Sequence, residues 1–457
     1  MKNFYNDIRN QLDEVSTSFC LAKWSQLTLY LQNGYNHSCH HPTPHKIPLR
    51  ELEKNHKALH NTKYKKRQMK QMLKGQRPSE CEYCWKIEDL GKEYISDRIY
   101  KSANSFSQVK KDEILEKRTQ DIEPSYLEVS FSSTCNMKCA YCSPDISSAW
   151  MEEVERFGGY PTSTKYNDIN YFKDNLKIPY KKSEHNPYVE AFWKWWPELY
   201  PKLHTLRITG GEPLLSKDTW KVMDELIENP NPNLIFSINT NLMIPDMLID
   251  KLIDKLNKLD GKVKELQLFT SGEATGKHNE YIRFGTIQEK WEKNCEKVLS
   301  NVKNVLFSIM TTVNLTSVVS YDDFIRYILK LRSKYINDVD FNKVQFMTNY
   351  LRYPEFLSIQ NLDNETKSMF EKNINNLINS SKNSNWESDT FLTEEQTNQL
   401  ERLIEYMNAN PVSEKLNKNR KDFYLFTVEY DKRRKLNFEE IFPQLTKFYK
   451  LCQNQIQ

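Results

Sequence analysis

Three cysteines stand close together in the stretch Thr134-Cys-Asn-Met-Lys-Cys-Ala-Tyr-Cys142, with three and then two residues between them. The stretch directly follows Val129-Ser-Phe131, which is typical of the end of a β-strand. Three thiolates on one short loop can hold three irons of a 4Fe–4S cluster and leave the fourth iron without a protein ligand. Zinc fits less well, because it needs a fourth ligand from elsewhere in the chain. We therefore expect a cluster held by Cys135, Cys139 and Cys142.

The composition of the chain indicates a globular protein. Of its 457 residues, 38% are hydrophobic and 28% are charged, which excludes wholesale disorder and a fibrous repeat. No stretch approaches the roughly 20 apolar residues of a membrane helix, and the N-terminus shows no apolar segment of a secretory signal. The formal net charge of +4 is too small to indicate nucleic acid. We expect a cytoplasmic protein with reduced thiols that binds neither nucleic acid nor membrane.

Strand-like and helical segments alternate from about residue 123. Helical stretches such as 216–228 and 287–299 lie between most of the strand candidates. This alternation indicates an α/β fold with βα units and a parallel sheet. Six units make an open, partial barrel instead of a closed eight-stranded one. The strand candidates are 126–131, 204–209, 234–239, 265–270, 305–312 and 343–348.

The first hundred residues have a different pattern and hold four more thiols. An alternating strand at 24–31 is followed by Asn33-Gly34, a strong hairpin signal, and then by a helix over 61–74. The returning strand is expected to bring Cys39 near Cys20, and a tight turn after the helix brings back Cys81 and Cys84. The expected parts of the chain are a small hairpin and helix module at 1–105, a barrel at 123–350 and an α-rich extension at 351–457.

A second motif, together with the cysteine stretch, resembles the radical S-adenosylmethionine (SAM) enzymes. Arg207-Ile-Thr-Gly-Gly-Glu-Pro213 ends the second strand and matches the Gly-Gly-Glu-Pro motif of that family. Glycines let the backbone approach a ligand closely, and a carbonyl and Glu212 can accept hydrogen bonds from the methionyl ammonium. The resemblance implies a partial (β/α)6 barrel. It also implies that SAM is cleaved reductively to a 5′-deoxyadenosyl radical, which abstracts hydrogen from a substrate.

Later strand ends resemble the family's other SAM contacts. Ser237-Ile-Asn-Thr-Asn241, Phe269-Thr-Ser-Gly272 and Glu280-Tyr-Ile-Arg-Phe-Gly285 are the stretches concerned. A guanidinium suits a carboxylate, so Arg283 is a candidate for the SAM carboxylate, with a surface salt bridge as the alternative. The residues that the resemblance assigns to SAM are Tyr141, Thr209, Gly210, Gly211, Glu212, Asn239, Ser271 and Arg283.

The four N-terminal cysteines resemble the twitch module, an auxiliary-cluster module of radical SAM enzymes. Pro78-Ser-Glu-Cys-Glu-Tyr-Cys-Trp85, with Glu88, Gly91 and Ser96-Asp-Arg98, is similar to that module's ending. The better-known members carry the module after the barrel, whereas here it comes first. Cys20, Cys39, Cys81 and Cys84 can fully coordinate a 4Fe–4S or 2Fe–2S cluster. Two alternatives stay open: a structural zinc, or a histidine near Cys39 (His37, His40, His41 or His45) in place of one thiol.

The expected reaction follows from the two sets of cysteines. A fully ligated auxiliary cluster has no free iron for substrate, so we expect it to take up an electron while a small molecule or peptide is oxidised. The resemblance implies a flavodoxin- or ferredoxin-type electron donor. A non-catalytic iron–sulfur protein is the alternative from another class, although it would not need Gly-Gly-Glu-Pro at a strand end. We expect the aromatic stretch 192–196 to be a packed helix, with a substrate-facing wall as the alternative.

Overall fold

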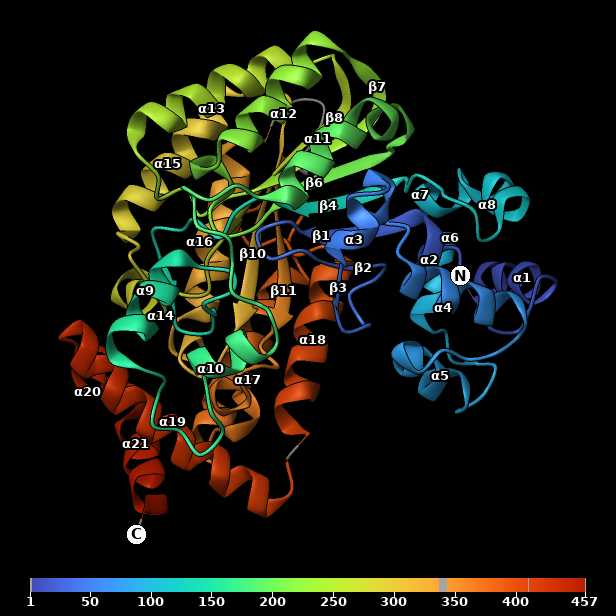
Figure 1. Cartoon of the computed structure of the whole chain (residues 1–457). Coiled ribbons are helices and arrows are strands. Elements are labelled where there is room, and N and C mark those ends of the chain that lie inside the picture. The colour runs from blue at the N-terminus through green and yellow to red at the C-terminus, as the bar shows by residue number, and fades with distance from the viewer. Residues whose placement is uncertain (1, 337–342, 410, 457) are drawn as a thin grey trace. The chain divides into compact units, whose positions relative to one another are not determined.

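Residues 2–336, 343–409 and 411–456 are described by the structure, a computed structural model of the chain (Figure 1). They divide into two compact units. The first comprises Met1–Ser133, Pro179–Ile238 and Gly261–Glu265, and the second comprises Thr134–Ile178, Asn239–Asp260 and Leu266–Gln457. Each unit is therefore assembled from segments that are far apart in the sequence. The boundaries of the three expected parts stay predictions.

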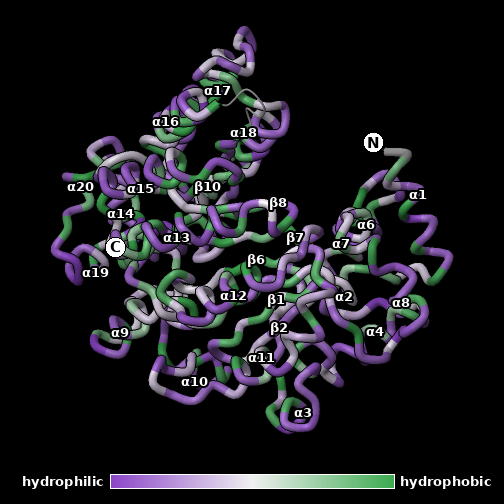
Figure 2. Tube along the Cα trace, turned by 90° about the horizontal axis from the view of Figure 1, so that it is seen from above, coloured by the Kyte–Doolittle hydropathy of each residue, from purple (hydrophilic) through white to green (hydrophobic). Residues whose placement is uncertain are grey.

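The first unit contains a sheet in which the strand order is β3-β2-β1-β4-β6-β7. The first three strands form an antiparallel ladder, whereas β1, β4, β6 and β7 pair in parallel. In Figure 2, hydrophobic residues lie along β1 and β6. The bounds are β1 (Gln26–Tyr30), β2 (Tyr35–His37), β3 (His45–Lys46), β4 (Tyr126–Ser130), β6 (Thr205–Thr209) and β7 (Asn231–Asn239).

Strand β1 is buried on both faces. Leu27 and Leu29 have no exposed surface, and the intervening Gln26 and Thr28 are only 6% and 4% exposed. The alternation at 24–31 is typical of a half-buried strand, and that expectation is wrong because both faces of β1 are covered. Strand β1 is also an inner strand, with β2 on one edge and β4 on the other. The expected N-terminal hairpin is thus hydrogen bonded to the first of the expected barrel strands.

The second unit contains three parallel strands in the order β8-β10-β11. Their bounds are β8 (Val263–Ser271), β10 (Leu306–Val313) and β11 (Val344–Tyr350). With β4, β6 and β7 of the first unit, all six expected strands form, and no boundary is off by more than three residues. The sequence therefore predicts an α/β fold correctly, and the closure of the strands into a partial barrel stays a prediction.

The expected helices at 61–74, 216–228 and 287–299 form as α4, α12 and α15. Side chains cap the first two, since Thr62 accepts from the N–H of Lys65 and Ser216 from that of Asp218. Among the described residues, no helix has the length and apolar content needed to cross a membrane. Figure 1 shows α1, α2, α4, α5 and α6 gathered at the N-terminal end of the first unit. The helices of the first unit are α1 (Lys2–Asp13), α2 (Ala22–Ser25), α3 (Leu49–Leu52), α4 (Lys63–Leu73), α5 (Glu82–Glu88), α6 (Asp97–Ala103), α7 (Ser105–Gln108), α8 (Lys111–Lys117), α11 (Pro187–Leu199) and α12 (Lys217–Glu228).

The second unit is richer in helices. Helix α18 lies along β11, where the side chain of Gln399 accepts a hydrogen bond of 2.8 Å from the N–H of Thr348. The helices of this unit are α9 (Ser148–Phe157), α10 (Ile169–Asp174), α13 (Asp246–Leu259), α14 (Gly276–Ile282), α15 (Gln288–Asn301), α16 (Tyr321–Lys334), α17 (Asn364–Ser381), α18 (Glu394–Asn408), α19 (Ser413–Arg434), α20 (Phe438–Ile441) and α21 (Thr446–Gln453).

The aromatic stretch at 192–196 lies in α11 and packs inward. Phe192 and Trp195 have no exposed surface, and Trp196 is 4% exposed. The ring of Phe192 meets that of Phe131 edge to face, with centroids 5.0 Å apart. The prediction of a packed helix is confirmed.

Gly34 forms the turn between β1 and β2 against a buried tyrosine. Its φ is +69°, and an added Cβ would lie 2.0 Å from the ring of Tyr188, which is 1% exposed. Gly261 has nearly the same φ, +73°, but no atom lies within 4 Å of its added Cβ. Substitution of Gly261 therefore introduces backbone strain alone, whereas substitution of Gly34 introduces backbone strain and steric overlap with Tyr188.

We expect Gly34→Ala to lower the free energy of unfolding more than Gly261→Ala does. Both changes place an alanine in the left-handed region, which costs about 1–2 kcal/mol. Only at position 34 must a buried ring also move, which adds roughly 1–3 kcal/mol. Urea or thermal unfolding of the two variants measures the difference, and equal destabilisation would contradict the packing of Tyr188 against the turn.

Candidate active site

The cysteine loop, residues 134–142, continues from the carboxyl end of β4. Cys139 lies in the short strand β5 (Lys138–Cys139) and is buried, whereas Cys135 and Cys142 are half-buried. The N–H of Cys142 donates to the carbonyl of Cys139 at 2.9 Å, which closes a tight turn. All three thiols are free of disulfides.

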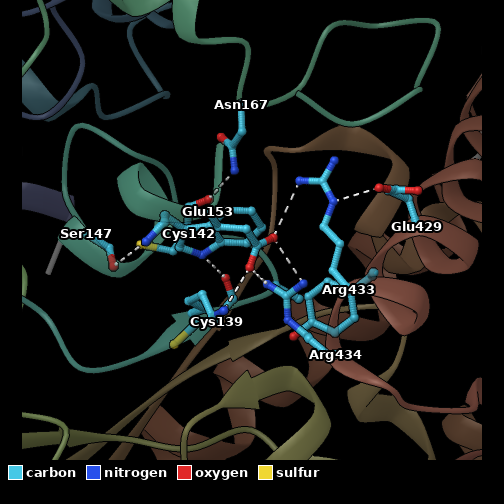
Figure 3. A network of polar contacts seen from close by, with 12 residues as sticks. Cys139, Cys142, Ser147, Glu153, Asn167, Glu429, Arg433 and Arg434 are labelled. Atoms are coloured by element: carbon cyan, nitrogen blue, oxygen red, sulfur yellow. Dashed lines mark hydrogen bonds and ion pairs between the residues drawn. The ribbon is translucent and has the colours of Figure 1, made fainter. Parts of the chain in front are cut away.

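Side chains from the segment after the loop hold its carbonyl oxygens (Figure 3). The indole N–H of Trp150 in α9 donates to the carbonyl of Cys139 at 2.9 Å. The carbonyl of Cys142 accepts from the hydroxyl of Tyr166 at 2.7 Å and from the amide of Asn167 at 3.1 Å. These bonds fix the backbone from which the sulfur atoms project.

The chemistry of the three thiols fits an iron–sulfur cluster. Burial raises the pKa of Cys139 and raises that of Cys142 well above the usual value, and the neighbouring thiolates of Cys139 and Cys135 add to the effect on Cys142. Such thiols stay protonated until a cation compensates the thiolate charge. Three soft donors on a fixed loop are the ligand set that iron–sulfur clusters use.

A second short sheet joins the cysteine loop to the segment around Arg283. Strand β5 pairs antiparallel with β9 (Arg283–Phe284), with Cys139 opposite Arg283. The N–H of Ala140 donates to the carbonyl of Ile282 at 2.8 Å. The approach needs a glycine, because at Gly285, where φ is +111°, an added Cβ would lie only 3.1 Å from a carbonyl of the loop. Two motifs that are distant in sequence therefore form one structural element.

Arg283 is buried in an ion pair beside Cys139. Its Nη1 donates to the hydroxyl of Tyr141 at 2.7 Å and lies 3.3 Å from Oε1 of Glu273, to which Tyr141 also donates. Burial opposes the charged form, but the charges of Cys139, Tyr141 and Glu273 raise the pKa of Arg283 well above its usual value. The alternative of a surface salt bridge does not hold, since Arg283 is 8% exposed. Its contact with SAM stays a prediction.

Glu273 is a residue of this site that the sequence analysis missed. It has no exposed surface, and burial raises the pKa of its carboxyl group while Arg283 opposes that rise. The one signal in the sequence is an acidic residue directly after the strand end Phe269-Thr-Ser-Gly272. Charged residues are almost never fully buried unless they are paired, so the position alone did not predict the ion pair.

The Gly-Gly-Glu-Pro motif follows β6, beside the end of β4. Ser130 and Thr209 are register partners, so the two carboxyl ends are neighbours. Gly210 has a φ of +132°, and an added Cβ would lie 2.7 Å from Oγ of Ser130. The N–H of Gly211 donates to a carbonyl of the loop after β4 at 3.2 Å. Glu212 is 2% exposed, and its Oε1 accepts from a backbone N–H two residues on, at 3.0 Å. Gly210 thus packs closely against the end of β4, and the approach of this motif to SAM stays a prediction.

The other predicted SAM contacts lie at strand ends of the second unit. Strand β7 ends at Asn239, so Asn239 and Asn241 face different neighbours. The amide of Asn239 lies 3.6 Å from Sδ of Met310, whereas that of Asn241 donates to Asn136 of the cysteine loop at 2.9 Å. Ser271 is the last residue of β8. The structure thus links Asn241, which was not assigned to SAM, directly to the cysteine loop.

Residues 129–331 match the radical SAM superfamily. The match covers less than half of the 457 residues of the chain. The matched segment includes the cysteine loop, the Gly-Gly-Glu-Pro motif and Arg283, and it leaves both ends of the chain outside. Searches of the curated proteins and of the solved structures found no match.

Outside the matched segment, the four N-terminal cysteines surround one cavity in the first unit. The cavity is lined by Cys20, Cys39, Cys81 and Cys84, together with Lys23 and other residues. None of these thiols is in a disulfide. The sequence analysis predicted that the hairpin would bring Cys39 near Cys20, and this is confirmed by their place in one cavity.

A buried cation lies beside these thiols. Lys23 has a side chain that is 4% exposed, and its ammonium pairs with the carboxylate of Glu80. Burial opposes its charge, but the thiolate of Cys81 and the carboxylate of Glu80 raise the pKa of Lys23 above its usual value. Burial also raises the pKa of Cys39 to about 11 and that of Cys81 to about 12. A lysine beside the cavity therefore suits a centre of net negative charge.

Hydrogen bonds and an ion pair connect the residues that resemble the ending of a twitch module. Arg98 is 3% exposed, and its Nε lies 2.8 Å from Oε1 of Glu88. Its Nη1 donates to the carbonyl of Phe19 at 2.9 Å, directly before Cys20, and Ser96 donates to Glu88. The motif thus fixes the backbone that leads into the first cysteine of the cavity.

His40, His41 and Asp97 form a second group that can hold a metal ion. One ligand atom of each lies within 4.8 Å of the others. Nε2 of His41 is 2.7 Å and that of His40 is 3.6 Å from Oδ2 of Asp97, and His41 stacks on Tyr83 with centroids 3.7 Å apart. His41 and Asp97 also line the cysteine cavity. The sequence analysis named both histidines as competing ligands, but not Asp97.

We expect Glu273→Gln to destabilise the protein far more than Asp254→Asn. The first change leaves the guanidinium of Arg283 buried without its carboxylate, which costs about 3–5 kcal/mol. The second breaks an exposed pair between Lys258 and Asp254, worth at most about 1 kcal/mol. Denaturant unfolding of both variants provides the comparison, and a loss below 1 kcal/mol for Glu273→Gln would show that the buried pair does not hold the site.

Proposed function

We propose that this protein is a radical SAM enzyme in which Cys135, Cys139 and Cys142 hold a 4Fe–4S cluster with one iron open to SAM. One observation carries the proposal. The loop with these three thiols lies inside the segment that matches the superfamily, and side chains hold its carbonyl oxygens by hydrogen bonds. When bound, the cluster supplies the electron that cleaves SAM, and the resulting 5′-deoxyadenosyl radical abstracts hydrogen from the substrate.

The chain's own residues bind and orient SAM in this proposal. Gly210 and Gly211 bring backbone groups close to the ligand, and Glu212 accepts from its ammonium. Arg283 keeps a positive charge beside Cys139, and a guanidinium that is already fixed by Tyr141 loses little freedom when it meets a carboxylate. Thr209, Asn239 and Ser271 supply polar groups at the ends of their strands.

We further propose that Cys20, Cys39, Cys81 and Cys84 hold an auxiliary cluster, 4Fe–4S or 2Fe–2S. The shared cavity and the buried Lys23 support it. With all its irons ligated, this centre suits electron uptake during oxidation of a small molecule or peptide. A flavodoxin- or ferredoxin-type protein is the proposed electron donor.

A second candidate is a radical SAM enzyme with zinc in the N-terminal module. The group formed by His40, His41 and Asp97 favours it, because two imidazoles and a carboxylate are a set of ligands that zinc accepts. Metal analysis distinguishes the two: zinc near one per chain with about four irons supports this candidate, and a larger iron content without zinc supports the auxiliary cluster.

We expect Cys139→Ala to abolish the formation of 5′-deoxyadenosine from SAM and dithionite, because it removes a ligand of the proposed cluster. The matched control is Cys295→Ala, which removes a fully buried thiol from α15. Both proteins are reconstituted anaerobically with iron and sulfide, and the product is measured by chromatography. Undiminished product in Cys139→Ala would refute the assignment of the loop.

We expect Cys81→Ala to lower the iron content while SAM cleavage persists. The second set of cysteines is proposed to serve a separate centre, so its loss leaves the open iron unaffected. Cys452→Ala, a buried thiol in α21, serves as the control. Equal iron in Cys81→Ala and the unchanged protein would remove the auxiliary cluster from the proposal.

A further inference from the structure

The C-terminal helix α19 contributes two arginines to an ion network beside the cysteine loop (Figure 3). At its centre is Glu153 of α9, whose side chain is 2% exposed. Its carboxylate lies 2.9 Å from Nζ of Lys138, 3.0 Å from Nη2 of Arg434 and 3.6 Å from Nη1 of Arg433. The hydroxyl of Tyr160 donates to it at 2.7 Å.

Arg434 is enclosed by groups that also hold the cysteine loop. Its side chain has no exposed surface, and its guanidinium carbon lies 5.2 Å from the ring of Trp150 and 5.2 Å from that of Phe284. Trp150 donates to the carbonyl of Cys139, and Phe284 belongs to β9, which pairs with β5. A change at Arg434 can therefore affect Cys139 by two routes, one through Trp150 and one through Phe284 and the pairing of β9 with β5.

The network carries an excess of positive charge. Burial alone would raise the pKa of Glu153, but Arg434, the bond from Tyr160 and Lys138 lower it, so the carboxylate is ionised. Glu153 and Glu429, whose Oε1 lies 2.8 Å from Nε of Arg433, are the two negative groups of the network. They face three positive ones, Lys138, Arg433 and Arg434, which leaves one positive charge. Charges act strongly on one another where water is excluded. The excess lies within one residue of Cys139, because Lys138 precedes it in β5.

We propose that Arg434 is a positioning residue for the cluster: it fixes the cysteine loop through Trp150 and Glu153, and its charge raises the reduction potential of the cluster. This inference rests on the proposed cluster at Cys135, Cys139 and Cys142. Net charge and surroundings set the potential of iron–sulfur clusters, and nearby positive charge favours the reduced form. The charge of Arg434 thereby makes reduction of the cluster by its electron donor easier, and it makes the reduced cluster a weaker reductant toward SAM.

The test is the midpoint potential of the reconstituted protein, followed by electron paramagnetic resonance in a redox titration. Arg434→Met removes one positive charge, so the potential is expected to become more negative and a smaller fraction of the cluster to be reduced at a given dithionite concentration. Arg434→Lys keeps the charge and is expected to restore most of the potential. The titration is made in Cys81→Ala protein, so that a second cluster does not overlap the signal.

Arg420→Met is the matched control for a purely structural role. Arg420 lies on the same helix, and its guanidinium holds the carbonyls of Asn361 and Leu362 at 2.8 and 3.1 Å, away from the network. If Arg434 only stabilises the fold, both methionine variants lose thermal stability and neither changes the potential. That result would overturn the inference.

Glu153→Gln provides a test by sign. Removal of the negative charge is expected to move the potential in the positive direction, opposite to Arg434→Met. The double variant Glu153→Gln/Arg434→Met again has one positive charge in excess and is expected to return near the original potential. In Arg434→Met the buried carboxylate of Glu153 loses a partner, which can prevent folding. The double variant has no such carboxylate and can be measured in its place. If the midpoint potential of Glu153→Gln shifts in the negative direction, the charge effect is refuted. If the protein without substitutions binds no cluster after reconstitution, the proposed function is refuted instead.

Discussion

The pairing of β5 with β9 is the constraint on which the proposed active site depends. It places Cys139 opposite Arg283 and connects a loop that follows β4 to a segment nearly 150 residues later. The glycine at 285 is needed because the two backbones approach so closely that a side chain would not fit. Around this pairing, Trp150, Tyr166 and Asn167 satisfy the carbonyls of the loop, so the sulfurs project from a backbone whose polar groups already have partners.

Buried cations accompany the thiols at both cysteine sets, which follows from the cost of burying thiolates. A thiolate away from water needs compensation, or its pKa rises and it stays protonated. In the second unit Arg283 and Arg434 lie near the cysteine loop, each with its own carboxylate, Glu273 or Glu153. In the first unit Lys23 has the same relation to Glu80 and Cys81. In each case a carboxylate keeps the cation ionised before any cluster is present.

The sequence predicts the features whose signals are local. The cysteine spacing, the glycines at 210 and 211, the hairpin turn at Gly34 and the six strands are all read from neighbouring residues, and the strands and helices form where they are expected. Glu273, Asp97 and the pair of Glu153 with Arg434 were missed. Arg283 is only ten positions from Glu273, but the other partners lie between 56 and 281 positions away. Neither the spacing nor the hydropathy of residues predicts such contacts, because they form only when the tertiary structure brings distant segments together. Strand β1 was misjudged for a related reason, since the face that carries its polar residues is covered only in the folded chain.

Strand β1 has a consequence for how the protein can be divided. Five consecutive residues of β1 are in parallel register with five of β4, the strand from which the cysteine loop emerges. A truncated protein that begins at residue 123, the expected start of the barrel, would therefore leave the edge of β4 without its partner strand. Such edges recruit other chains and cause aggregation. The N-terminal hairpin thus covers the edge of β4 and protects the sheet from pairing with other chains. It cannot be exchanged or removed as a domain on a flexible linker can.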